Sequence, residues 1–394
     1  MLLSVAWRLN YSGLISYSWI CLSMVARADG EDNSPEYALD YSVEDPLVAK
    51  AFLLVPCLLA VGNCHPRSDP NDELWESFKR DHNKQYESLE IEAARKKIFF
   101  DNKRKIDEHN ALYERGETSF KLGINPLADV TLDEIPNKGI KPREDPFTLF
   151  SVSKEGPIQF EATGAKLPET VDWREKGILS PIKAQYNCLA CWAFAATDAI
   201  ESQYALKYGK HLLLSQQQLV DCSQEEGNLG CQGGMVDWAY KYIMRVGGLE
   251  QDSDYPYQIE DDKCTFNASK IAASISNYGE IKNGSEVSLQ EAVAFYGPIS
   301  VCIDSSSFQW NYYTEGIFDY PYCTTDVDHA VVVVGYGTEN GTDYWLVKNS
   351  YGETFGQKGY IKMARNKGNQ CAIASYGNFP IVGDWKPFSP PPQA

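Results

Sequence analysis

Two cysteines three positions apart, Cys188 and Cys191, are the first residues of this 394-residue chain whose spacing points to chemistry. A C-x-x-C pair can be a redox couple, half of a zinc site, or two cysteines with separate roles. A thioredoxin-type pair follows a buried strand, and the preceding run "SPIKAQYNC" does not read as one. A structural zinc site needs further ligands, and Cys222, Cys231 and Cys264 form no second tight pair. We therefore expect the two cysteines to have separate roles.

Cys191 opens a predicted helix. The run "CWAFAATDAIESQYALKYG" has apolar residues at helical spacing, and Gly209 marks its end. The residues expected on one face are Trp192, Ala196, Ala199, Ile200 and Tyr204. Because the free N–H groups and the dipole of a helix N-terminus favour a thiolate, we expect a lowered thiol pKa at Cys191. A cysteine in this position can act as a nucleophile if a base can reach it.

Candidate bases are few, since the chain has 5 histidines and most of them precede the cysteine pair. His211 follows the predicted helix and is expected on the surface. His329 begins "HAVVVVGYG", a run apolar enough to be a buried strand. A single histidine there is more often structural than catalytic. However, Asn349 ends another apolar run, "YWLVKNS", and completes a Cys/His/Asn set.

The elements that must position this set fall into blocks along the chain. Residues 69–137 are charged and helical in period, with apolar side chains at Trp75, Phe78, Ile98, Phe99, Ile106 and Leu112. Residues 141–166 mix proline, glycine and charge, as a linker does. In residues 167–384 the aromatic residues, glycines and cysteines become dense, and "PISVCI", "AVVVVGYG" and "YWLVKNS" are predicted strands. This last block is therefore expected to be an α+β domain.

Composition excludes some functions. The net charge of −18 argues against binding nucleic acid, which needs a basic face, and 11 cysteines are typical of a secreted or vesicular protein. Two apolar stretches, "SGLISYSWICLSMVARA" and "AFLLVPCLLAVG", precede residue 64; the second has the length of a signal-peptide core, and the first ends in an A-x-A cleavage pattern. The sequence does not decide which one directs export, and a membrane-anchored N-terminus stays open.

The Cys/His/Asn set lies within ordered motifs that run from about Leu74 to Pro380. These are "LPETVDWREKGILSPIKAQ", "LSQQQLVDCS", "GCQGG", "YPY", "GPISV", "DHAVVVVGYG", "YWLVKNS" and "GYIKMARNKGNQC". Upstream, a second set is spaced as in an inhibitory propeptide helix and the motif after it: Arg95, Ile98, Phe99, Asn102, Ile106, Asn110, Gly123, Asn125 and Asp129. Together they resemble the papain-like cysteine peptidases, closest to the cathepsin L and S group. Ile91 and Leu127 depart from the usual Glu and Phe.

The resemblance implies two subdomains, one mostly helical and one β-barrel-like, with the active site in the cleft between them. Cys191 and His329 would form a thiolate–imidazolium pair, in which the thiolate attacks a peptide carbonyl and His329 protonates the leaving amine. Asn349 would orient the His329 ring, and Gln185 would join the Cys191 N–H in an oxyanion hole. The implied function is a cysteine endopeptidase made as a zymogen, with no metal or organic cofactor.

The resemblance also implies pairings and subsites that cysteine counting leaves open. The family disulfides map onto Cys188–Cys231, Cys222–Cys264 and Cys323–Cys371, which leaves Cys302 unpaired. The implied substrate-binding residues are Gly233, Gly234, Met235, Val236, Cys302, Val327, Asp328, Ala330, Tyr351, Phe355 and Tyr376. Relatives often have a small residue where Tyr376 stands. We therefore expect a short S2 pocket that prefers P2 side chains of Val or Leu size over Phe.

Several residues depart from the family's run Q-G-x-C-G-[SA]-C-W and from its later aromatic positions. Tyr186 and Leu189 replace glycines, which often allow a positive φ or a close backbone approach. Tyr351 and Phe355 stand where the family has tryptophans. All the catalytic groups remain within this altered frame. Two hypotheses therefore stand, an active peptidase and a catalytically impaired papain-fold homologue that binds peptides or proteins.

From the resemblance we divide the chain into four parts. They are an N-terminal extension with a signal or anchor segment (1–64), an inhibitory propeptide and linker (65–166), a papain-like peptidase domain (167–384) and a Pro-rich tail (385–394). The implied partners are protein or peptide substrates, the chain's own propeptide as inhibitor and cystatin-type inhibitors, for a monomer that binds no nucleic acid. We expect a lysosomal or extracellular location, which suits the glycosylation sequons at Asn267, Asn283 and Asn340.

Overall fold

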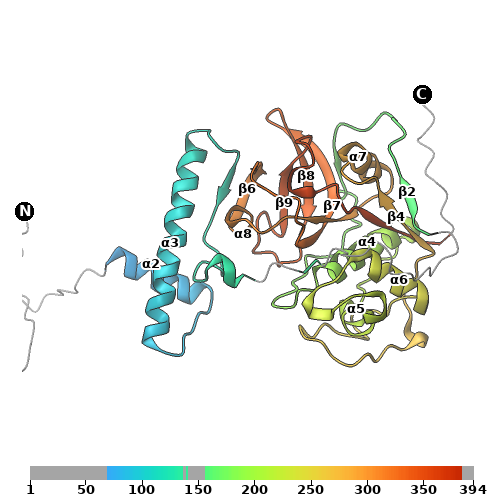
Figure 1. Ribbon diagram of the computed structural model, residues 1–394, viewed down its shortest axis with the longest axis horizontal. Helices are drawn as coiled ribbons and strands as arrows, with labels where there is room; N and C mark the ends of the chain where they lie inside the picture. Colours follow the sequence, from blue (N-terminus) through green and yellow to red (C-terminus); the bar gives the residue numbers. More distant parts are fainter. Residues whose placement is uncertain (1–68, 136–138, 141–155, 384–394) are drawn as a thin grey trace, which may run out of the picture. The chain divides into compact units, whose positions relative to one another are not determined.

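The computed structural model describes residues 69–135, 139–140 and 156–383 (Figure 1). The expected N-terminal extension, most of the expected linker and the Pro-rich tail lie outside these residues. Within the described ranges, no helix is both long enough and apolar enough to cross a membrane.

The leader, which we define as the described residues before 141, contains the helices α2 (Pro70–Asp81) and α3 (Leu89–Glu114). Both confirm the helical periodicity of this block. Trp75 and Phe78 on α2 pack against Phe99 on α3, with ring centroids 5.4 and 4.6 Å apart. All three side chains are almost fully buried. The aromatic positions seen in the sequence therefore form the core of the leader.

Two asparagines of the propeptide-like motif tie the leader together. Asn102 Nδ2 donates to the carbonyl oxygens of Ala128 and Val130, at 3.1 and 2.9 Å. Asn110 exchanges two hydrogen bonds with the backbone of Leu122, at 2.8 and 2.9 Å. An amide side chain can donate and accept at once, which is the chemistry that these two positions require. The spacing of the motif therefore reflects where the following loop and strand lie along α3.

The strands of the described residues form one sheet. Its strand order is β1-β6-β9-β8-β7-β5-β10-β4-β2, with β3 paired to β7. Its central strands are β5 (Ile299–Ile303), β7 (His329–Glu339) and β8 (Thr342–Lys348), which confirm the three predicted strands. The other strands are β1 (Phe120–Leu122), β2 (Ile158–Phe160), β3 (Val171–Asp172), β4 (Asn277–Ile281), β6 (Tyr313–Phe318), β9 (Tyr360–Ala364) and β10 (Asn378–Ile381).

A helical layer accompanies the sheet (Figure 1). Its helices are α4 (Cys191–Tyr208), α5 (Gln216–Cys222) and α6 (Val236–Val246), and α7 (Glu286–Phe295) and α8 (Phe308–Asn311) lie nearer the strands. Short 3-10 helices are η2 (Leu132–Glu134), η3 (Gln224–Glu226), η4 (Gly230–Gln232), η5 (Ala268–Lys270) and η6 (Gln370–Ala372). One buried core lies mainly among α4, α5 and α6, and a second lies mainly within the sheet. The fold is thus the expected α+β architecture.

The two outermost strands of the sheet both precede residue 167. β1 pairs antiparallel with β6, and β2 pairs parallel with β4. Gly316 on β6 has φ 89°, and a Cβ there would lie 2.3 Å from the carbonyl oxygen of Ser119, so only glycine lets β1 approach this closely. Edge strands of a sheet carry unpaired backbone groups. The segments before residue 167 satisfy these groups on both sides.

The segment after β2 also contacts the block of residues that begins at 167. The buried Glu291 on α7 accepts hydrogen bonds from the backbone and hydroxyl of Thr163 and from the Gly164 N–H. Phe160 on β2 packs edge-on against Tyr296, with ring centroids 5.3 Å apart. By its contacts, this part of the expected linker belongs with the block that follows it.

His109 on α3 is a proton-sensitive contact within the leader. Its Nε2 lies 2.9 Å from the Phe120 carbonyl oxygen, which can only accept, so Nε2 carries the hydrogen. Burial lowers the pKa of His109 below its usual 6.5, and the bond to Phe120 opposes this only in part. The unfolded leader therefore binds this proton more readily than the folded leader. Folded stability is lost as the pH falls through about 6.5, the unfolded value.

Substitution of His109→Gln keeps an N–H donor for Phe120 but removes the group that takes up the proton. We expect the variant to need a lower pH than the parent for release of its leader. Gel analysis of the processed fraction across a series of acid buffers measures this. The exposed His211 supplies the control His211→Gln, which should follow the parent profile. An unchanged profile for His109→Gln would contradict the assignment.

Candidate active site

Cys191 is the first residue of α4, in a turn that no side chain caps. The preceding residue, Ala190, has no polar side chain, so the first N–H groups of the helix stay available. The backbone N–H groups of Trp192 and Ala330 hydrogen-bond to the sulfur. Since Ala330 directly follows His329, the nucleophile helix meets the start of β7 at this sulfur. The structure therefore brings together two candidates that are far apart in the sequence.

Six of the cysteines in the described ranges form three disulfides. These are Cys188–Cys231, Cys222–Cys264 and Cys323–Cys371. The two free cysteines of these ranges, Cys191 and Cys302, are both buried. Cys188 and Cys191 thus have the separate roles expected of them, because the first fixes the loop and the second keeps its thiol.

His329 and Asn349 form a hydrogen-bonded pair whose tautomer follows from its geometry. Asn349 Oδ1 lies 2.8 Å from His329 Nε2 and also accepts from the Ser350 N–H at 2.8 Å. Because two groups approach it and one of them can only donate, this atom is the oxygen of the amide. His329 Nε2 therefore carries the hydrogen, and Nδ1 is left able to accept a proton. The ring of Tyr351 covers the histidine, with centroids 4.7 Å apart.

Gln185 lies between the nucleophile loop and the end of β8. Its Oε1 accepts from Ser350 Oγ at 2.7 Å, and its Nε2 donates to the Cys188 carbonyl at 3.1 Å. Its backbone N–H donates to the Ser350 carbonyl at 2.9 Å. The side chain is almost fully buried. One hydrogen of Nε2 is used by Cys188, so the second can serve another acceptor in the cleft.

Burial decides the charge of the pair in this state of the chain. It raises the pKa of Cys191 from 9.0 to about 12, against the opposing bonds from Ala330 and Trp192, and it lowers the pKa of His329 to about 4. The rise for the thiol corresponds to roughly 4 kcal/mol, whereas a helix N-terminus typically supplies about 0.3–1 kcal/mol. The expectation of a lowered thiol pKa is therefore wrong here, because desolvation outweighs the helix. Both groups are neutral near pH 6.

Two residues of the leader, Gly139 and Ile140, lie against Cys191 and its neighbours. The Gly139 carbonyl accepts from the Gly234 N–H at 2.9 Å, and the Ile140 N–H donates to the Asp328 carbonyl at 3.2 Å. A Cβ on Gly139 would lie 2.6 Å from Cys191 Sγ. Only a glycine can therefore pass over the sulfur at this distance. The leader binds the cleft through backbone groups on either side of the nucleophile.

The expected apolar subsite residues belong to the same buried core as Ile140. One buried cluster contains Ile140 together with Met235, Val236, Cys302, Val327 and Ala330. Gly233 has φ 111°, a backbone conformation that favours glycine. A Cβ on Gly234 would lie 2.8 Å from the ring of Trp192, so a side chain does not fit at that position. Tyr376 is 37% exposed and lines a surface pocket with Met235.

Two further predicted positions lie beside the leader, and a third, Asp328, is buried. Tyr351 and Phe355 line a pocket of about 270 Å³ with Gln185 and with Leu127 of the leader. Asp328 is buried, and burial raises its pKa to about 6 although Ser305 donates two hydrogen bonds to its carboxylate.

The two glycine replacements differ in their consequences. Tyr186 has φ 53°, which is a left-handed conformation that costs a non-glycine residue roughly 1–2 kcal/mol, and its side chain is 67% exposed. The φ of Leu189 is not positive, so its backbone is unstrained. The family glycine is thus needed for backbone freedom only at the position of Tyr186.

Sequence reasoning missed Ser350, which bonds both Gln185 and Asn349, and a buried ionic cluster around Asp198. The sequence contained a signal for Ser350, because this residue directly follows the candidate Asn349. Asp198 also had one, since it is a carboxylate seven residues after Cys191 in an otherwise largely apolar helix. Gly139 and Ile140 carried no chemical signal in the sequence.

Comparison with known proteins agrees with this geometry. Residues 167–381 match the papain family cysteine protease model, and residues 75–135 match the cathepsin propeptide inhibitor domain (I29). A cathepsin L-like peptidase of Aedes aegypti is 41% identical over 338 residues, covering 84% of this chain and 100% of that protein. Cathepsin S of Mus musculus is 44% identical over 334 residues, covering 83% of this chain and 96% of that protein.

Solved structures agree as well. A digestive procathepsin L2 from the larval midgut of Tenebrio molitor has a TM-score of 0.74 and 36% identity, covering 79% of this chain and all of that one. Fold, leader and site together define a cysteine endopeptidase made as a zymogen. The chain belongs to the papain family of cysteine proteases and carries that family's cathepsin-type propeptide domain.

The contact of Gly139 with the sulfur leads to a direct prediction. In Gly139→Ala the added methyl group would meet Cys191 Sγ, so residues 139–140 must move away from the sulfur. We expect iodoacetamide to alkylate Cys191 in the intact zymogen about tenfold faster than in the parent, a difference near 1.4 kcal/mol. Mass spectrometry of the peptide containing Cys191 measures the rate. Leu89→Ala, at a leader position that is 82% exposed, is the control that should leave it unchanged.

Proposed function

We propose that the mature enzyme cleaves peptide bonds with Cys191 as nucleophile, His329 as base and acid, and Asn349 as the group that orients the histidine. One observation carries this proposal: the leader backbone passes directly over Cys191 Sγ and is bound by Gly234 and Asp328. A groove that holds an extended chain against the sulfur is suited to a peptide substrate.

Release of the leader would restore water to the site and remove the cause of both pKa shifts. The thiol pKa would then fall and the imidazole pKa would rise, which favours the thiolate–imidazolium pair. The Cys191 thiolate would attack the carbonyl carbon of the scissile peptide and form a tetrahedral oxyanion. The Cys191 N–H and Gln185 Nε2 are the groups placed to stabilise it.

Collapse of this intermediate would break the C–N bond while His329 gives its proton to the departing amine. The acyl group is then held as a thioester on Cys191. His329 would next take a proton from water, whose oxygen attacks the thioester carbon. Departure of the Cys191 sulfur would release the new carboxyl group and regenerate the starting pair.

Further properties of the enzyme belong to the same proposal. We propose that it is monomeric, works in lysosomes or outside the cell after entering the secretory pathway, and is inhibited by cystatin-type proteins. The sequon residues Asn267, Asn283 and Asn340 are all exposed, which supports glycosylation there. The N-terminal extension, residues 1–64, would supply the signal or anchor segment for export.

An epoxide probe directed at thiols tests the catalytic assignment. The acid-matured enzyme should take up one probe per molecule at Cys191 and lose peptide hydrolysis at the same rate. Cys191→Ser should neither bind the probe nor turn over substrate, with a loss of about 10³-fold or more. A matured wild-type protein that binds peptides without labelling would support the alternative of a non-catalytic binding protein.

Subsite preference is tested separately. Ile140 is a buried β-branched side chain in the same apolar core as the proposed S2 residues, which supports a pocket of Val or Leu size. We expect kcat/KM for fluorogenic peptides to be higher with Val or Leu at P2 than with Phe. Tyr376→Ala should narrow this difference if Tyr376 closes the pocket. Fastest turnover of the Phe peptide by the wild type would overturn the prediction.

A further inference from the structure

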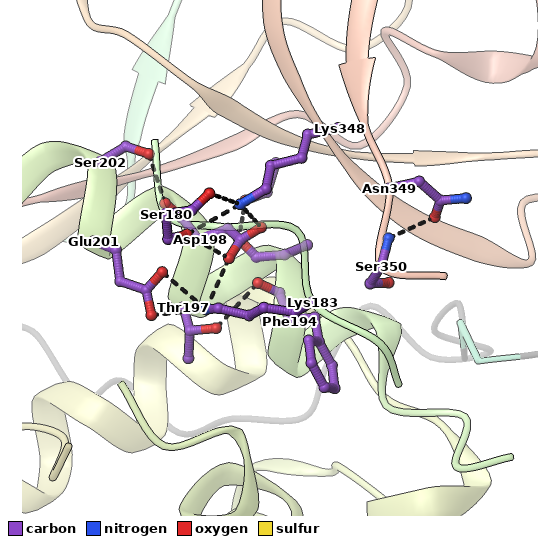
Figure 2. Close-up of polar contacts among 12 residues, drawn as sticks. Ser180, Lys183, Phe194, Thr197, Asp198, Glu201, Ser202, Lys348, Asn349 and Ser350 are labelled. Carbon is purple, nitrogen blue, oxygen red and sulfur yellow. Dashed lines mark hydrogen bonds and ion pairs between the residues drawn. The ribbon is translucent and has the colours of Figure 1, made fainter. Parts of the chain in front are cut away.

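A buried ionic cluster lies behind the active site, at the junction of three chain segments (Figure 2). Asp198, on α4, is 2.8 Å from the Lys183 ammonium through Oδ1 and 2.8 Å from the Lys348 ammonium through Oδ2. Glu201, one turn further along α4, binds Lys183 at 2.7 Å. Lys348 also donates to the backbone carbonyl and hydroxyl of Ser180, at 2.9 and 3.0 Å.

The cluster is shielded from water. Two carboxyl groups face two ammonium groups, and Asp198, Glu201 and Lys348 are each at most 6% exposed. Burial raises the pKa of Glu201, although the charge of Lys183 opposes this. Burial alone would raise the pKa of Asp198, but the charges of Lys183 and Lys348 outweigh it and lower the pKa to about 2. The folded carboxylate therefore stays ionised in mildly acidic solution. The stability that it contributes is present above the unfolded value near 3.8 and is lost as the pH falls toward 2.

Each segment that meets at Asp198 carries a candidate catalytic residue. Asp198 lies seven residues after Cys191, about two turns along the same face of α4. Lys183 lies two residues before Gln185. Lys348 is the last residue of β8 and directly precedes Asn349. One carboxylate thus joins the segments of the nucleophile, the oxyanion donor and the histidine partner.

The segments that carry Gln185 and Asn349 are also hydrogen-bonded to each other on the side of the cleft. The Gln185 N–H donates to the Ser350 carbonyl at 2.9 Å, and Ser350 Oγ donates to Gln185 Oε1 at 2.7 Å. Adjacent side chains of a strand point to opposite faces. Lys348 can therefore anchor the end of β8 to α4 while Asn349 presents its amide to His329.

We infer that Asp198 is a positioning residue for the proposed reaction, because its carboxylate sets where the Gln185 and Asn349 segments lie relative to the Cys191 helix. A buried ion pair adds little net stability over well-packed apolar groups, but its hydrogen bonds impose a defined geometry. This inference rests on the function proposed above. It assigns Asp198 no contact with the substrate.

The test uses three variants of the full-length zymogen, each matured in acid. Asp198→Asn keeps Oδ1 for Lys183 but turns an N–H group toward the Lys348 ammonium, so the direct ion pair with β8 is lost. The double variant D198N/K348M also removes the unpaired charge of Lys348. Glu226→Gln is the matched control, because Glu226 is a buried carboxylate paired with Arg245 in segments that carry no candidate catalytic residue.

We expect D198N to lower kcat for a fluorogenic peptide about tenfold while KM changes less than about threefold. D198N/K348M should recover the thermal midpoint but not kcat, because the charge is balanced again while the link stays broken. Iodoacetamide alkylation of matured Cys191 should become slower on the acid side of its pH profile in both variants, since less thiolate forms there when Asn349 no longer holds His329 in place. Glu226→Gln should keep the parent kcat and pH profile.

Two results would overturn the inference. One is a kcat for D198N close to that of the parent, and the other is recovery of kcat together with the thermal midpoint in the double variant, which would assign Asp198 to charge balance alone. If D198N fails to fold, the double variant still separates the two roles. An inactive parent enzyme would instead refute the proposed function, and Cys191 labelling of the parent distinguishes that case.

Discussion

Desolvation of the Cys191 thiol and the His329 imidazole is the constraint that sets the charge of both groups in this zymogen. Both groups are useful as ions and are costly to ionise when water is removed. Two leader residues, Gly139 and Ile140, lie over this site, and the first must be glycine because the backbone passes so close to Cys191 Sγ. The candidate groups Cys191, His329 and Asn349 therefore lie at one site, and burial sets the charge of the first two.

The leader also contacts the rest of the chain outside Gly139 and Ile140. The structure provides the additional contacts by extending the sheet, since β1 pairs with β6 and its Phe120 side chain is buried in the core of the sheet. The helices of the leader are joined by aromatic packing, and Asn102 and Asn110 bind α3 to the loop and strand that follow it. His109 lies within this network and accepts a proton there less readily than it would in the unfolded chain, because burial lowers its pKa.

On the catalytic side, the geometry depends on contacts between segments that are distant in the sequence. Ser350 joins Gln185 to Asn349 at the cleft, and Asp198 joins Lys183 to Lys348 behind it. The strained backbone at Tyr186 is held between these anchored segments, with its side chain exposed. The hydrogen bonds of Gln185 with Ser350 and Cys188 are present beside these departures from the family's glycines.

The sequence by itself determined the elements and the identity of the reactive groups. Helical periodicity and Gly209 located α4, apolar runs located β5, β7 and β8, and ordered motifs singled out the Cys/His/Asn set, because these signals depend on neighbours along the chain. Only the tertiary structure decided that Cys191 and His329 are neutral beneath the leader, that Tyr186 is left-handed and that Asp198 links three segments. Burial and long-range ion pairs depend on which distant segments meet, and local pattern does not contain that information.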